Sequence, residues 1–453
     1  MPNSTIAAVS SPLGEGGIGT VRISGEDAFL IADKVFKSKS GKTVSEIGGY
    51  SALFGNVYSG EEFIDTAVAL KFCAPKSYTG ENTVELSVHG GSFVLTKLLR
   101  AVLKAGATPA AAGEFTKRAF LNGKLDLTEA ESVMAVISAE NDAQLRMANA
   151  ALSGKVSQKI KEIEEILLST AASVAVYSDY PEEYLPELSG EEFFNNLNKA
   201  TGLLDTMLDE YDIGKKIKNG IKTAILGKPN VGKSTLMNLI TGEEKAIVTS
   251  VAGTTRDVLE ETVNIGNTTL LLYDTAGIHE TSDEVEKIGV MRSIKKMDEC
   301  DIFLLVFDTS SPISQDDIKL IEKLKGKAAI AVLNKSDILA YDYLPYIKDM
   351  PHVLVSAKQQ KGLSSLLEKI EELAKTKGFR ADGGVLLNSR QYNSAYKARK
   401  TVCDAIDARN IGLTTDAVGV CIDEALTELY ALTGKRVTNE VADEVFRNFC
   451  VGK

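Results

Sequence analysis

The stretch Gly227-Lys228-Pro229-Asn230-Val231-Gly232-Lys233-Ser234 decides how the middle of this chain folds. It fits the pattern G-x-x-x-x-G-K-[ST], in which a glycine-rich loop leads from a buried strand into a helix. The apolar run 223–226 predicts that strand, and the residues after Lys233 predict the helix. Backbone N–H groups of such a loop, together with the helix N-terminus, bind phosphate groups. The stretch therefore predicts a nucleoside triphosphate site in a doubly wound α/β domain.

The polar side chains of this loop have separate chemical roles in such a site. Lys233 neutralises the oxygens of the β- and γ-phosphates, and the Ser234 hydroxyl is a suitable ligand for Mg²⁺. A plain glycine-rich turn is the alternative, but four matched positions between a strand and a helix make a specific signal. The predicted nucleotide-binding residues of the loop are Asn230, Val231, Gly232, Lys233, Ser234 and Thr235.

Three shorter motifs follow in order, each at the end of a strand-like apolar run. They are Asp274-Thr275-Ala276-Gly277 after residues 270–273, Asn334-Lys335-Ser336-Asp337 after 330–333, and Ser356-Ala357-Lys358 after 353–355. The first motif supplies a carboxylate near the metal and a glycine amide near the γ-phosphate. An ionised Asp337 accepts hydrogen bonds from N1–H and the 2-amino group of guanine, two donors that adenine lacks. Together the motifs predict that the nucleotide is GTP.

Length and composition limit the remaining possibilities. A chain of 453 residues predicts about three domains, and the net charge of −11 disfavours broad attachment to nucleic acid but allows a local basic surface. No apolar stretch approaches 18 residues, so we expect no membrane span. The start of the chain lacks a secretion or organelle signal, which predicts a cytoplasmic protein. Five scattered cysteines indicate reduced thiols rather than a structural zinc site.

The pattern of apolar residues divides the chain into four segments. Short β-like runs at 5–10, 18–24, 66–72 and 84–89, with a helical stretch at 93–104, predict a small α+β domain over residues 1–120. Helical periodicity dominates 121–215 and returns in 378–453, on either side of the α/β segment 216–377. Neither helical part makes a convincing core alone. We therefore expect one discontinuous helical domain into which the α/β domain is inserted.

Several longer stretches carry a resemblance to a known family. They are residues 14–19 (GEGGIG), 21–25 (VRISG), 77–82 (SYTGEN), 89–91 (HGG), 113–124 (GEFTKRAFLNGK), 252–257 (AGTTRD) and the tail 450–453 (CVGK). Along essentially its whole length the chain resembles the MnmE or TrmE family of tRNA-modification GTPases. The resemblance implies a GTPase that works with a flavoprotein partner, MnmG, which carries FAD. Together they would add an aminomethyl-type group to C5 of the wobble uridine of certain tRNAs.

The resemblance also implies a folate site and a quaternary structure. The one-carbon unit would come from 5-formyl- or 5,10-methylene-tetrahydrofolate, held by the N-terminal domain at Arg22, Glu85, Lys124 and Lys453. Cations suit the glutamate tail of folate, and a carboxylate can pair with the donor edge of the pterin. Taken alone, each of these residues is more often a solvated surface charge. The family forms homodimers through this domain, and with MnmG it forms a heterotetramer-like complex.

Hydrolysis must proceed without the usual glutamine. The residue after the D-T-A-G motif is Ile278, whose side chain cannot orient water as the glutamine of Ras-like GTPases does. The resemblance implies that Glu286 orients or polarises the water instead. The alternative is that Glu286 is one more charge in a solvated acidic patch.

The charge that develops between the phosphates also needs a counter-cation, and no arginine finger is evident in the sequence. The resemblance implies a potassium ion held by Asn230, Thr249, Val251 and Thr254, although Asn230 could instead be a simple turn residue. Thr255 is the candidate second Mg²⁺ ligand beside Ser234. The predicted nucleotide-binding residues of this loop are Thr249, Ser250, Val251, Ala252, Gly253, Thr254 and Thr255.

Some features leave alternatives open. Cys450 could attack C6 of the target uracil, but a terminal thiol without an identified base is more often inert. Gln391 and His279 depart from the family pattern, because many members have His and Arg there. The alternative function is a regulatory or ribosome-assembly GTPase without modification chemistry. Such proteins tend to add a KH module or a second G domain, and the sequence shows neither.

Overall fold

The computed structural model describes residues 4–12, 14–179, 190–242, 260–265, 268–274, 300–338, 341–436, 438–447 and 449–453. The chain forms two compact units. The first comprises Met1–Met134, Leu152–Thr201 and Asn393–Lys453, and the second comprises Ala135–Ala151 and Gly202–Tyr392. Each unit therefore contains segments that are far apart in the sequence.

The first unit contains a seven-stranded sheet with the order β3-β4-β5-β6-β2-β1-β7. Neighbouring strands are antiparallel, except that β7 pairs with β1 in parallel. The strands are β1 (Ile6–Val9), β2 (Gly19–Ser24), β3 (Phe36–Ser38), β4 (Ser51–Ser59), β5 (Glu62–Phe72), β6 (Thr83–Val88) and β7 (Thr108–Pro109). Each β-like run expected from the sequence overlaps a strand of this sheet, while β3, β4 and β7 were not expected.

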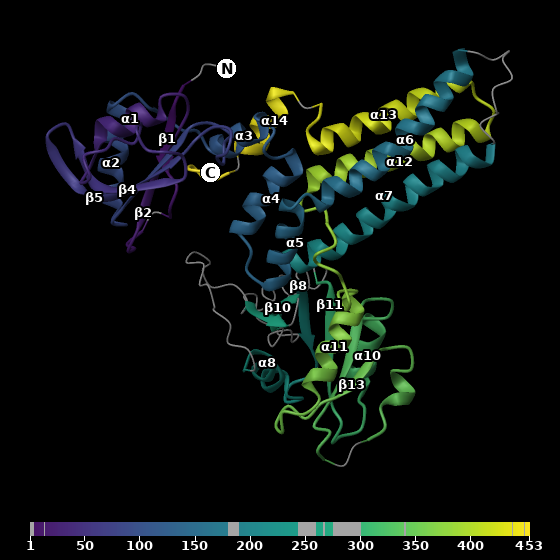
Figure 1. Cartoon of the computed structure of the whole chain (residues 1–453). Helices are drawn as coiled ribbons and strands as arrows, with labels where there is room; N and C mark the ends of the chain where they lie inside the picture. The colour runs from purple at the N-terminus through teal and green to yellow at the C-terminus, as the bar shows by residue number, and fades with distance from the viewer. Residues whose placement is uncertain are drawn as a thin grey trace, which may run out of the picture. The chain divides into compact units, whose positions relative to one another are not determined.

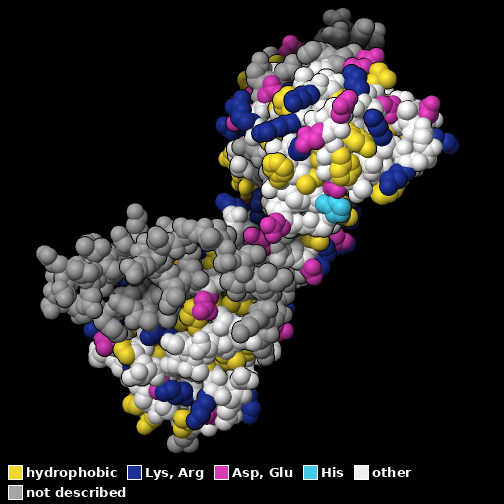
Figure 2. All heavy atoms as spheres, turned by 90° about the vertical axis from the view of Figure 1, so that its left-hand side faces the viewer, with side chains coloured by type: hydrophobic (Ala, Val, Ile, Leu, Met, Phe, Trp, Pro, Cys, Tyr) yellow, Lys and Arg dark blue, Asp and Glu magenta, His cyan; other side chains and the backbone are white. Residues whose placement is uncertain are grey.

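Helices α1 (Ala28–Val35) and α2 (Ser92–Lys104) cover one face of this sheet. Side chains alternate between the two faces of a strand, so Val21 and Ile23 of β2 face the helices and are fully buried. The opposite face carries cross-strand pairs of a different kind. Arg22 pairs with Glu85, and Phe54 pairs with Val68, with exposed fractions of 55% for Phe54 and 38% for Val68. Apolar side chains gather among charged ones on the face drawn in Figure 2.

Helices that precede the second sheet in the sequence pack against helices that follow it, and these contacts lie in the first unit. Helix α6 lies along α13, as Figure 1 shows, and α3 packs against α14. Phe120 and Phe446 meet in the apolar cluster under α14. The helices are α3 (Glu114–Leu121), α4 (Leu127–Ile137), α5 (Asp142–Leu152), α6 (Lys155–Asp179), α7 (Gly190–Asn219), α12 (Ser389–Asn410), α13 (Thr415–Thr433) and α14 (Asn439–Arg447). The fold class predicted from the sequence, with a discontinuous helical domain, is confirmed.

The second unit contains a six-stranded sheet with the order β13-β12-β11-β8-β10-β9, parallel except at β9. Its strands are β8 (Ile221–Leu226), β9 (Glu260–Ile265), β10 (Thr268–Asp274), β11 (Ile302–Asp308), β12 (Ala329–Asn334) and β13 (His352–Leu354). The described helical elements that follow β8 in this unit are α8 (Lys233–Gly242), α10 (Gln315–Lys323), the 3₁₀ turn η1 (Leu344–Tyr346) and α11 (Leu363–Ala374), and α5 and the second part of α7 also belong to it. Two apolar cores, one on each side of the sheet, define a doubly wound layer arrangement.

Candidate functional site

The loop after β8 has the backbone of a phosphate-binding loop. Gly227, Asn230 and Gly232 have positive φ angles of 151°, 64° and 95°. A Cβ atom at Gly232 would lie 2.4 Å from Nδ2 of Asn334, and one at Gly227 would lie 2.5 Å from the carbonyl oxygen of Val306. Both glycines are therefore required by conformation and by space, which explains the glycine spacing of the motif.

Lys233 begins α8 and reaches back over the loop. Its Nζ donates hydrogen bonds to the carbonyl oxygens of Gly227 and Lys228, each at 2.8 Å. Ser234 and Thr235 follow in the first turn of α8, and both are exposed. The N-terminus of a helix carries unpaired N–H groups and partial positive charge, so this corner is suited to an anion.

The residues predicted to recognise the base meet the phosphate loop through Asn334. Its Nδ2 donates to the carbonyl oxygen of Val231 at 2.9 Å, and its Oδ1 accepts from the N–H of Ala357 at 3.1 Å. This buried side chain thus joins the ends of β8 and β12 to the segment after β13. Lys335 adds a hydrogen bond of 3.3 Å to the carbonyl oxygen of Asn230 and an ion pair of 2.6 Å with Asp308. Three motifs separate in sequence therefore form one contiguous site.

Asp337 lies at the open end of this site, where a base could reach it. The Ser356 hydroxyl donates to its Oδ1 at 2.6 Å, and this hydrogen bond holds the pKa of the Asp337 carboxyl below its usual value. The carboxylate is therefore ionised at neutral pH and can accept hydrogen bonds. Ser336 and Lys358 are exposed beside it.

Some predicted site residues lie outside the described part of the chain. For Asp274 the structure describes the backbone, which pairs with Ile225 next to the phosphate loop. The remaining ones are Thr249, Ser250, Val251, Ala252, Gly253, Thr254, Thr255, Thr275, Ala276, Gly277 and Glu286. Among the described residues no cluster of His, Cys, Asp and Glu could hold a metal ion. Of the predicted metal ligands, Asn230 and Ser234 are within that part, and both are exposed.

A second site lies on the open face of the first unit's sheet, around Arg22. Its Nε donates to Oε1 of Glu85 at 2.8 Å, and its guanidinium lies 5.4 Å from the ring centre of Tyr78 and 5.5 Å from that of Phe115. The Nη1 group of Arg22 is buried and has no hydrogen-bond partner among the described residues. A buried cationic donor without an acceptor is costly, so this atom indicates a place for an anionic or polar ligand.

The end of the chain completes this second site. The N–H of Phe115 donates to the carbonyl oxygen of Lys453 at 3.2 Å, and that of Gly113 donates to Cys450 at 3.3 Å. Burial and the nearby charge of Arg22 lower the pKa of the Lys453 amine, while Glu85 opposes this effect. The amine is thus close to Arg22 and Glu85.

The other two predicted residues of this region lie differently. Lys124 is exposed and lies against Gly80, two positions from Tyr78. The Cys450 thiol is free, exposed and close to the Lys453 amine. No hydrogen bond joins this thiol to an acid–base side chain among the described residues, so the geometry shows no general base for it.

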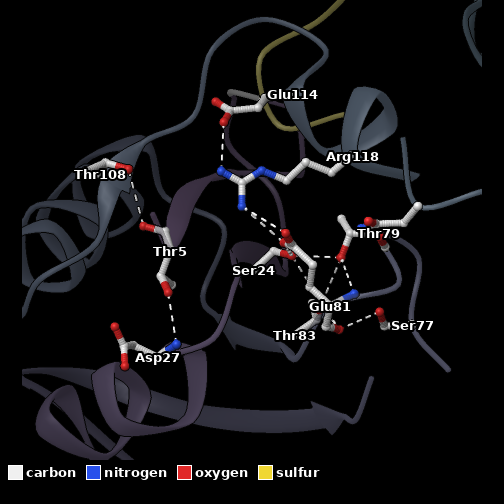
Figure 3. A network of polar contacts seen from close by, with 11 residues as sticks. Thr5, Ser24, Asp27, Ser77, Thr79, Glu81, Thr83, Thr108, Glu114 and Arg118 are labelled. Atoms are coloured by element: carbon white, nitrogen blue, oxygen red, sulfur yellow. Dashed lines mark hydrogen bonds and ion pairs between the residues drawn. The ribbon is translucent and has the colours of Figure 1, made fainter. Parts of the chain in front are cut away.

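A polar network fixes the loop that carries Tyr78. The Ser24 hydroxyl donates to Glu81 at 2.7 Å, and Arg118 donates to both Glu81 oxygens at 3.1 Å and to Glu114 at 2.9 Å (Figure 3). Glu81, Glu114 and Arg118 also line a cavity of about 750 Å³ beside α14. Tyr78, Phe115 and Arg118 lie in stretches that carry the family resemblance, but their spacing in the sequence does not show that they share a site.

The fold and the first site define a P-loop protein of the guanine-nucleotide type. Comparisons with known proteins give the family. The sequence model of the MnmE helical domain matches residues 127–450, and that of the GTP-binding protein TrmE N-terminus matches residues 5–124. The chain belongs to the MnmE family of tRNA modification GTPases.

Individual relatives agree over their whole length. The tRNA modification GTPase MnmE of Clostridioides difficile is 40% identical over 100% of this chain and 99% of that relative. The tRNA modification GTPase MnmE of Caldicellulosiruptor saccharolyticus is 37% identical over 100% of both chains. Among solved structures, the G domain of the T. maritima FeoB iron transporter is 29% identical and covers 34% of this chain and 98% of its own, with a TM-score of 0.27. Within the described ranges, no helix has both the length and the apolar character to cross a bilayer.

Proposed function

We propose that this protein hydrolyses GTP and couples hydrolysis to modification of C5 of the wobble uridine in certain tRNAs. The observation that carries the proposal is the preformed nucleotide site, in which Asn334 joins the phosphate loop to the segment after β13. In this proposal Lys233 turns from the loop carbonyls to the β- and γ-phosphates. Asp337 accepts from the two guanine donors, and a backbone N–H of residues 356–358 other than that of Ala357, which already donates to Asn334, faces the guanine carbonyl.

The metal ions of the proposed mechanism have partial support. The Ser234 hydroxyl is exposed at the N-terminus of α8, and a hydroxyl oxygen is a suitable ligand for a hard cation such as Mg²⁺. Thr255 would be its second protein ligand. Asn230, held in a left-handed conformation, would supply the side-chain oxygen for potassium, with Thr249, Val251 and Thr254 as further ligands. Potassium would offset charge that develops between the phosphates, and Glu286 would orient the attacking water.

A one-carbon folate is the proposed ligand of the second site. The unpartnered Nη1 of Arg22 and the nearby Lys453 amine fit an anionic or polar group of the ligand, and the Tyr78 and Phe115 rings line the same space. Glu85 would pair with the donor edge of the pterin, and Lys124 would approach from beside Gly80. Either 5-formyl- or 5,10-methylene-tetrahydrofolate satisfies this chemistry.

The proposed assembly is a homodimer through the N-terminal domain, joined by the FAD protein MnmG and by tRNA in the cytoplasm. Support for the homodimer comes from the exposed Phe54 and Val68, because a second copy would remove this apolar sheet face from water. In this proposal residues 1–120 bind folate, 216–377 form the G domain, and 121–215 with 378–453 form the helical domain.

The test combines a base-specificity variant with tRNA analysis. Asp337→Asn loses the paired acceptor for guanine, so GTP affinity should fall by a factor of about 10³ or more, while an amide donor suits the 2-oxo group of xanthine. Cells that lack the gene should lose the wobble C5 modification, and the wild-type gene but not Asp337→Asn should restore it. Unchanged GTP affinity in the variant would contradict the role of Asp337. Intact wobble nucleosides in the deletion strain, with a ribosomal-subunit imbalance, would contradict the modification function.

A further inference from the structure

An ion pair holds the second position of the phosphate loop to another element. The Lys228 Nζ lies 2.7 Å from Oδ2 of Asp317 and donates to the Ser314 hydroxyl at 2.8 Å. Asp317 lies in the first turn of α10, and its side chain is 2% exposed, against 30% for that of Lys228. A buried carboxylate is stable only when it is paired and hydrogen-bonded, so this contact is built into the fold.

The N-terminus of α10 provides the remaining partners of Asp317. Ser314 is the N-cap residue, and its side chain accepts from the N–H of Asp317 at 3.3 Å. In return, Oδ2 of Asp317 accepts from the N–H of Ser314 at 2.9 Å and from its hydroxyl at 2.8 Å. Burial and the charge of Asp317 together raise the pKa of the neighbouring Tyr343 to about 12. The Lys228 ammonium group therefore pairs with a capping box, whose side chains are held by their own hydrogen bonds, and not with a solvated surface carboxylate.

The backbone of Lys228 connects this anchor to the phosphate site. Its carbonyl oxygen accepts from the Lys233 Nζ at 2.8 Å. Pro229 follows directly, and a residue before proline is restricted to extended conformations. With the backbone restricted and the side chain fixed at α10, the direction of the Lys228 carbonyl is fixed as well.

We infer that Lys228 is a positioning residue: anchored to Asp317 and Ser314, it holds the phosphate loop in the shape that binds nucleotide, and it acts through Lys233. This inference rests on the proposed GTP-binding function and names the residues that preorganise its site. Asp317 and Ser314 lie at the start of α10, the helix that follows β11. The shape of the phosphate loop therefore depends on a helix that contributes none of the four nucleotide motifs. Preorganisation of this kind lowers the conformational cost of binding.

The test measures release of a fluorescent GDP analogue from the full-length protein. Lys228→Met keeps the length and apolar stem of the side chain but removes the charge, and we expect release about tenfold faster than from the wild type. Lys228→Arg should restore most of the retention, because it keeps a cation within reach of Asp317. Lys319→Met is the matched control, since Lys319 forms an exposed ion pair with Asp316 on the same helix. Its release rate should equal that of the wild type.

A double-mutant cycle separates positioning from simple stability. If Lys228 acts through Asp317, then Lys228→Met/Asp317→Asn should release GDP no faster than the faster single variant. GDP raises the melting temperature of the wild type, and this rise should be smaller in Lys228→Met. If Lys228 had a purely structural role, the substitution would lower the melting temperatures with and without GDP by the same amount. Wild-type release and a wild-type GDP shift in Lys228→Met would overturn the inference, as would strictly additive effects in the double variant. If Lys228→Met does not fold, the same two criteria apply to Asp317→Asn. A wild-type protein that binds no guanine nucleotide would instead overturn the proposed function together with the inference.

Discussion

At the scale of single residues, Gly232 shows how steric fit determines the nucleotide site. Its φ of 95° is unfavourable for any residue with a side chain, and a Cβ atom would lie 2.4 Å from the Asn334 Nδ2 that bonds to Val231. Gly232→Ala should therefore displace Asn334 and cost about 1–3 kcal/mol in strain. We expect GTP affinity to fall at least tenfold, as measured by calorimetry.

Gly242 offers the control for this substitution. It ends α8, and a Cβ atom there would meet nothing within 4 Å. Gly242→Ala should leave GTP affinity unchanged within about twofold, because alanine favours a helix and meets no neighbour. Equal affinities for the two alanine variants would show that the contact with Asn334 does not shape the loop.

Single residues also show what could be predicted from the sequence. The glycine-rich loop and Asp337 could be recognised because each motif is contiguous and the chemistry depends on local spacing. Tyr78, Phe115 and Asp317 could not be recognised, because a ring beside Arg22 or a carboxylate beside Lys228 depends on contacts between distant segments. Side-chain proximity across a fold is not encoded in any short spacing.

At the scale of elements, the buried Gln391 forms hydrogen bonds at the start of α12. The N–H of Gln391 donates to Asn388 Oδ1 at 2.9 Å, and Oε1 of Gln391 accepts from the N–H of Leu387 at 2.7 Å. Gln391 is 1% exposed, so its removal would leave a polar group without a partner. Gln391→Ala should lower the free energy of unfolding by about 1–3 kcal/mol in urea titration. Gln158→Ala, on an exposed face of α6, should cost less than about 0.5 kcal/mol. Equal losses in the two variants would rule out the capping role.

The strands also differ in how well the sequence predicts them. The parallel strands β8 and β12 contain buried apolar runs at 224–226 and 329–333, and these runs made the strands predictable. Strand β4 was missed because the exposed Phe54 interrupts the apolar–polar alternation that indicates a half-buried strand. Its outward aromatic side chain is part of the open sheet face for which we propose a dimer.

At the scale of the whole molecule, the insertion of the α/β segment was predictable because neither helical part could bury a core alone. The return of the chain's end to the first sheet was implied by the family resemblance, which placed Lys453 with Arg22 and Glu85. The pattern of residues alone did not predict it, because it depends on Gly452. That residue has a φ of 98°, and a Cβ atom there would lie 2.1 Å from the carbonyl oxygen of Val9. The close approach lets the tail reach the site of Arg22.

Removal of the last four residues, 450–453, tests whether the tail contributes to folate binding but not to GTP hydrolysis. The truncated protein loses the Lys453 amine beside Arg22 and the hydrogen bond from Phe115, so affinity for 5-formyl-tetrahydrofolate should fall about tenfold or more in calorimetry. Lys453→Ala, which keeps the backbone contacts, should show a smaller loss. The described nucleotide-binding residues all belong to the second compact unit, whereas the tail belongs to the first, so basal GTP turnover should stay within about twofold of the wild type. Full folate affinity after truncation would show that the tail is not part of the folate site.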